Sequence, residues 1–288
     1  MPLTIVFEND NYSHLADEIG CRALSGKKRT IAPPRALTKS AMRQEKGIPG
    51  DTRYELTQLI RLALPLVAAQ LAQMGMGVAD TIMAGQVGAL ELAGVALGGA
   101  VLWPTLMLVS GVVMSTTPMI AQLNGAGKDS EVGEVTRQGL WVALGLGILL
   151  TICLKNAGPV YLALGIDAAI VDVTMGYLGA ASWGMVPVLG YFALRYFCEG
   201  LSWTKPAMLI AGIGLLLKIP LNYWFVFGGL GIEPMGAEGC GWATALIMIL
   251  ELLAMAGVVA FSRVSRFGLF ARFSPPNSSQ IATLFRVG

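Results

Sequence analysis

Long apolar stretches separated by short polar connections make up most of the chain from about residue 55 onward. Each stretch is long enough for the roughly 20 residues that a membrane-spanning helix needs. Prolines lie inside several of them, and we expect kinks there, because neighbouring helices can satisfy the freed backbone groups. The pattern therefore predicts an all-α bundle of six spanning helices, at about 56–84, 92–122, 137–155, 170–197, 206–227 and 239–261.

The two ends of the chain have a different pattern from its middle. Residues 1–53 are polar and rich in lysine and arginine, which predicts a disordered cytoplasmic tail. Residues 54–264 hold the six predicted helices. Residues 265–288 predict a cytoplasmic polar linker, "FSPPNSS", and then the start of a truncated seventh helix.

Composition places the chain in the lipid bilayer. It has 288 residues, of which 55% are hydrophobic and only 13% charged, and its mean hydropathy is +0.64. A soluble domain carries about 25% charged residues. The net charge of +2 gives no sign of a nucleic-acid partner, and none is expected. The four scattered cysteines and the single histidine, His14, predict no metal site or thiol catalyst, and no cofactor is expected.

Lysine and arginine indicate the orientation. The connections that would lie on the side of the N-terminus carry Lys128, Arg195, Lys205 and further arginines, whereas 85–91 and 228–238 carry none. Because positive residues accumulate in cytoplasmic loops, both ends of the six-helix lobe are expected in the cytoplasm.

Asp80, Lys218 and Glu251 are charged residues inside predicted spans. Asp80 lies in the first span. A charge at mid-membrane costs about 2.5–3.5 kcal/mol, so such an acid usually has a function. The alternative is an acid close enough to the membrane surface to be solvated. Lys218 in the fifth span needs a partner, and both Asp80 and Glu251 of the sixth span qualify. Glu251 matches its depth better, but the flexible lysine stem could climb to Asp80. Arg195 and Glu199, four residues apart, predict an ion pair.

Five strings occur in order along the helices: "ADTIMAG", "TPMIAQLNGAG", "ALRYFCEGLSWTKPAM", "IPLNYWFVFGGLG" and "GAEGCGWATA". Together they resemble the MATE family (multidrug and toxic compound extrusion), in its NorM-like bacterial branch. The resemblance covers residues from about 55 to 288 and only the N-terminal of the family's two six-helix lobes.

The resemblance implies a transporter rather than an enzyme, located in the bacterial inner membrane, that exports drugs or organic cations by antiport with Na⁺ or H⁺. It implies that Asp80 binds the coupling cation together with Tyr177, Asn222 and Thr244. Lys218 departs from the asparagine usual in this branch, so Lys218 and Glu251 are predicted modulators. A half-length transporter needs a second lobe or a homodimer, and the alternative is a truncated, non-transporting remnant.

Overall fold

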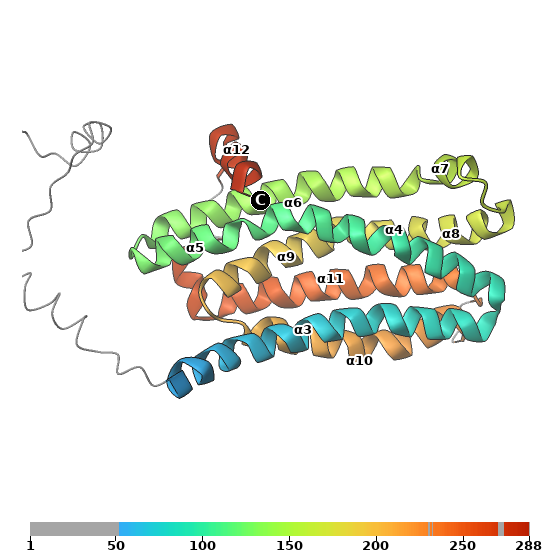
Figure 1. The fold of residues 1–288 in the computed structure, drawn as a ribbon, viewed down its shortest axis with the longest axis horizontal. Coiled ribbons are helices and arrows are strands. Elements are labelled where there is room, and N and C mark those ends of the chain that lie inside the picture. Colours follow the sequence, from blue (N-terminus) through green and yellow to red (C-terminus); the bar gives the residue numbers. More distant parts are fainter. Residues whose placement is uncertain (1–51, 230, 232, 270–273, 288) are drawn as a thin grey trace, which may run out of the picture. The chain divides into compact units, whose positions relative to one another are not determined.

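The computed structural model describes residues 52–229, 231, 233–269 and 274–287. The predicted tail thus lies almost wholly outside the described residues. The described part is helical (Figure 1). Its elements are α3 (Thr52–Val87), α4 (Ala89–Met114), α5 (Thr116–Gly125), α6 (Asp129–Lys155), α7 (Gly158–Ala163), α8 (Ala168–Ala181), η2 (Ser182–Gly184), α9 (Met185–Gly200), α10 (Lys205–Phe227), α11 (Ala237–Phe261), η3 (Arg263–Phe267) and α12 (Ser278–Val287).

The six predicted spans correspond to six helical rods. Five of them are long and apolar enough to cross a membrane, with α4–α5 and α8–α9 each forming one rod. The first predicted span forms α3, a helix of 36 residues that carries more polar side chains and is not among those five. The third begins eight residues earlier than expected, at Asp129, because Asp129 and Glu131 suit the positive end of the α6 dipole.

Two of the five prolines mark interruptions rather than kinks. The second rod breaks at Ser115, three residues before Pro118, and the fourth passes through the short η2 segment just before Pro187. Proline has no N–H to donate to the carbonyl four residues earlier, so the helix yields at that turn. Pro65, Pro104 and Pro220 remain inside continuous helices.

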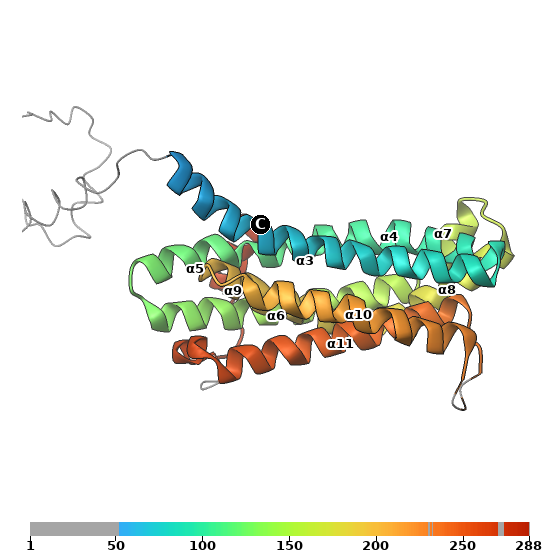
Figure 2. The same ribbon diagram turned by 90° about the horizontal axis from the view of Figure 1, so that it is seen from below.

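The helices run up and down between two ends of the bundle (Figures 1 and 2). At one end, here the Gly88 end, lie the α3–α4, α6–α8 and α10–α11 connections. At the other, the Lys128 end, lie the α5–α6 and α9–α10 connections and the end of α11. Large apolar side chains such as Leu108, Leu216 and Phe261 are exposed on the outside, as suits a surface covered by lipid.

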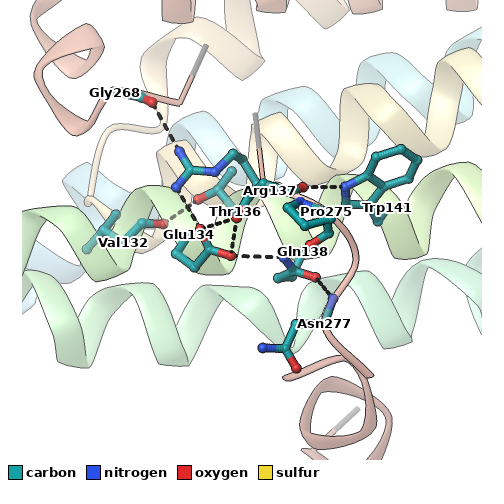
Figure 3. Close-up of polar contacts among 10 residues, drawn as sticks. Val132, Glu134, Thr136, Arg137, Gln138, Trp141, Gly268, Pro275 and Asn277 are labelled. Atoms are coloured by element: carbon teal, nitrogen blue, oxygen red, sulfur yellow. Dashed lines mark hydrogen bonds and ion pairs between the residues drawn. The ribbon is translucent and has the colours of Figure 1, made fainter. Parts of the chain in front are cut away.

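Residues 274–277 lie against the first half of α6 (Figure 3). Ser274 donates a hydrogen bond to Glu134, Trp141 donates to the Ser274 carbonyl at 2.9 Å, and Gln138 donates to the Pro275 carbonyl at 3.0 Å. The Asn277 N–H in turn donates to Gln138. Helix α12, where the start of a seventh helix is predicted, follows directly and contacts α6 and α4.

Candidate functional site

Three helices bring Asp80 and Lys218 together with two neutral polar side chains. Asp80 lies on α3, Lys218 and Asn222 lie one turn apart on one face of α10, and Thr244 lies on α11. All four side chains are at most 5% exposed. The alternative that Asp80 is an acid solvated near the surface therefore does not hold, because these side chains cover it.

Both oxygens of the Asp80 carboxylate have partners. Oδ1 lies 2.9 Å from the Lys218 Nζ and accepts a hydrogen bond from the Asn222 amide at 2.7 Å. Oδ2 accepts from Thr244 at 3.2 Å and from the same ammonium at 3.2 Å. Lys218 also donates to the Thr244 hydroxyl. The pair is thus electrically neutral and fully hydrogen-bonded, which is what a buried ion pair requires.

The structure decides between the two partners predicted for Lys218: its ammonium pairs with Asp80. The depth comparison favoured Glu251, but it measured only helix positions. Lysine carries its charge on a flexible four-carbon stem, so its ammonium reaches a neighbouring layer of the bundle.

Asn222 and Thr244 supply oxygen atoms that could bind a cation other than the lysine ammonium. The Asn222 Oδ1 is buried and has no hydrogen-bond partner in the described part of the chain. An amide oxygen, a hydroxyl and a carboxylate are hard oxygen ligands. Asp80, Thr244 and the free Asn222 oxygen could therefore hold a small cation if the ammonium moved away.

Glu251 occupies a separate place on the same helices. It is 2% exposed and accepts a hydrogen bond from the Gln73 amide of α3 at 2.9 Å. Sequence reasoning did not single out Gln73, since a neutral amide in a helix carries no charge penalty. Its spacing of seven residues from Asp80, two helical turns on one face, is the signal that could have found it.

A cavity of about 740 Å³ adjoins this cluster. Asp80 and Gln73 contribute to its wall, as do the aromatic side chains Trp103, Tyr177 and Phe192. This volume lies within the range of small-molecule sites, which combine apolar walls with a few polar groups. The cavity therefore has the size and lining for an apolar ligand with a polar or charged group.

Tyr177, predicted to lie near Asp80, does line the same cavity. Two glycines hold its helix close: a Cβ on Gly98 would lie 2.6 Å from the Tyr177 ring, and one on Gly241 would lie 2.4 Å from the Tyr177 carbonyl. Small residues at such contacts let membrane helices approach one another. Tyr177 is thereby placed in the cavity by the packing of α4 and α11.

Arg195 and Glu199 form the predicted ion pair on α9, at 2.7 Å, and both side chains are at most 12% exposed. Arg195 also lines the cavity. One turn before it on the same face lies Tyr191, whose hydroxyl is buried without a partner in the described part of the chain. The pair is therefore buried inside the bundle.

Comparison with known proteins links this geometry to a family. The sequence profile of the MatE family matches residues 65–224. The chain is 39% identical over 235 residues to the multidrug resistance protein NorM of Aliivibrio fischeri, covering 81% of this chain and 51% of NorM. It is 44% identical over 207 residues to the multidrug resistance protein MdtK of Edwardsiella ictaluri, covering 72% of this chain and 45% of MdtK.

Solved structures show the same fold. A eukaryotic MATE transporter, AtDTX14, superposes with a TM-score of 0.74 at 20% identity, over 81% of this chain and 51% of that one. A MATE structure in the straight conformation superposes with a TM-score of 0.70 at 25% identity, over 80% and 51%. The chain thus spans about half the length of the relatives it matches. With a family profile over more than half of its residues and this similarity to NorM and MdtK, the chain is a multi-pass membrane protein that belongs to the MATE family of multidrug efflux transporters.

Proposed function

We propose that this chain forms the N-terminal lobe of an antiporter in the bacterial inner membrane, with its N-terminus and the Lys128 end in the cytoplasm. The lobe would export drugs or organic cations in exchange for Na⁺ or H⁺. The observation that carries the proposal is the buried Asp80 carboxylate in the wall of the 740 Å³ cavity. A carboxylate is a cation ligand, and its place beside the cavity would let a bound cation affect a bound drug.

Coupling requires that cation and drug differ in their affinity for two arrangements of the bundle. Cation binding to Asp80, with Asn222, Thr244 and Tyr177 around it, would favour one arrangement and drug binding the other. Lys218 modifies this scheme, because its ammonium already occupies the carboxylate. A coupling cation would have to displace it.

The curated relatives are about twice as long as the matched part, so the working transporter would combine this lobe with a second one, supplied by another segment or by a second copy. The alternative is a remnant that does not transport. Drug efflux in a hypersensitive host, measured for the chain with and without a second lobe, distinguishes these two alternatives.

Asp80→Asn is the decisive variant, and Asp172→Asn is its matched control, because Asp172 is an exposed carboxylate on α8. We expect efflux by the two-lobe protein to be lost with Asp80→Asn and retained with Asp172→Asn. Efflux that survives Asp80→Asn would refute the coupling role of Asp80. No efflux from any two-lobe or dimeric form would support the remnant.

A further inference from the structure

The seam between α3, α10 and α11 contains two polar layers. The Asp80 layer comprises Asp80, Asn222 and Thr244. The Glu251 layer comprises Gln73 and Glu251, and the Glu251 carboxylate lies against Gly214. On α3 and α11 the two layers are seven residues apart, and on α10 eight, from Gly214 to Asn222. At 1.5 Å per residue the layers are separated by about 11 Å along the helices.

Lys218 lies midway between the layers on α10. It is four residues from Asn222 and four from Gly214. A Cβ built on Gly214 would lie 3.1 Å from the Glu251 Oε1, so this carboxylate lies against α10 one turn from Lys218. Side chains in a helix lean toward its N-terminus, which from Lys218 is the direction of the Glu251 layer. The four-carbon stem can therefore carry the ammonium to either layer.

The charges of the seam leave Glu251 without a counterion. The ammonium is committed to Asp80, and no ion pair involves Glu251 within residues 52–269 or 274–287, leaving aside 230 and 232. Its hydrogen-bond donor, the Gln73 amide, is neutral. A buried carboxylate without a cation is expensive, so it takes a proton instead.

The charged and titratable groups that face Glu251 do not change this balance. From α9 they are Arg195, which is paired with Glu199, and Tyr191, which is uncharged. From α10 the facing group is Lys218, and among the described side chains of α3 the amide of Gln73 faces Glu251. Within this set, Lys218 is therefore the cation that can move from one carboxylate partner to the other.

We propose that Lys218 is a tethered ammonium that moves between Asp80 and Glu251 and so exchanges a cation for a proton. A cation arriving from the cavity binds Asp80 and displaces the ammonium. The ammonium then pairs with Glu251, whose carboxylic acid breaks its O–H bond and releases the proton to water. Charge balances, because one monovalent cation enters the seam and one proton leaves it.

This proposal rests on Asp80 as the cation site, but its two-position lysine can be tested without transport. The probe is the infrared carbonyl stretching band of a protonated carboxylic acid, measured on the purified full chain in lipid nanodiscs. The wild type is expected to show this band from Glu251, and Glu251→Gln is expected to remove it, which assigns it.

Asp80→Asn gives the discriminating result. It removes the partner of Lys218 without touching Glu251, so the ammonium should move to Glu251 and ionise it. We therefore expect the Glu251 band to be lost in Asp80→Asn as well, although that residue lies two turns away. Persistence of the band at its wild-type intensity would overturn the proposal, because it would mean that Lys218 stays in the Asp80 layer.

Lys218→Met supplies a second test. Without the ammonium both carboxylates need protons, so the band should grow about twofold, whereas an unchanged band would contradict the charge balance. Asp172→Asn should leave the band unaltered, and size-exclusion profiles identify any variant that fails to fold. Failure of the proposed function has a different signature, namely efflux that survives Asp80→Asn.

Discussion

The buried pair of Asp80 and Lys218 permits a quantitative test by a double-mutant cycle. The perturbations are Asp80→Asn, Lys218→Met and the two together, with stability measured by reversible unfolding in mixed detergent. At 2.9 Å the attraction between the two charges is about 6 kcal/mol at an effective dielectric constant of about 20. The cost of desolvating both ions offsets most of this, so the pair adds little net stability.

Removing only one of the two charges has a larger effect on stability. Removing one partner of a buried pair costs about 3–5 kcal/mol, because the other charge stays buried and unpaired. Lys218→Met should lose this amount at alkaline pH in choline buffer, where neither a proton nor Na⁺ readily replaces the ammonium. Asp80→Asn should lose less, since Lys218 can pair with Glu251. The double variant removes both charges of the pair and should be more stable than Lys218→Met alone.

The coupling energy of the cycle shows whether the two charges compensate each other. Sites that do not interact show losses that add within about 0.5 kcal/mol. We expect instead that the double variant recovers at least about 2 kcal/mol relative to the sum of the two single losses. Additive losses would refute the reasoning that the two charges compensate each other inside the bundle.

Three further predictions concern the frame that holds the site, and each is read from unfolding of the purified chain. Gly241→Ala should destabilise it by about 1–3 kcal/mol, because its Cβ would meet the Tyr177 carbonyl, whereas the control Gly212→Ala, with open space around it, should not. Glu91→Ala should cost about 1–2 kcal/mol, since Glu91 accepts the 2.6 Å hydrogen bond from the Ala237 N–H at the start of α11. Tyr161→Phe should stabilise by about 1 kcal/mol, because the Tyr161 hydroxyl is buried without a partner and that burial also raises its pKa. A destabilised Tyr161→Phe or Gly212→Ala, or an unaffected Glu91→Ala, would contradict these packing arguments.

The pattern of apolar stretches predicted the helices well, because lipid requires about 20 apolar residues wherever a helix crosses. The third span was predicted to begin at 137, whereas its helix begins at Asp129, because Asp129 and Glu131 suit a helix N-terminus. The interruption at Ser115 was not predicted. A proline indicates that the helix must yield nearby, but the packing of neighbouring helices decides whether it bends or breaks.

The candidate site could be predicted unevenly. Asp80 is conspicuous by its cost in a membrane, and Asn222 and Thr244 came from the resemblance to the family. The partner of Lys218 depends on the direction of a long side chain, which sequence position does not determine. Gln73 was missed because a neutral amide is inexpensive in a helix, although it holds the second buried carboxylate.

The central claim is that Asp80 is a cation site whose cation in this chain is the ammonium of Lys218. It is tested most directly by Lys218→Asn, comparing melting temperatures in NaCl and in choline chloride at equal ionic strength. Binding to the folded state stabilises it by about 2.7 kcal/mol at a hundred times the dissociation constant. The account predicts that Na⁺ raises the melting temperature of Lys218→Asn more than that of the wild type, and that adding Asp80→Asn abolishes the gain. Equal responses of all three proteins to Na⁺ would contradict it.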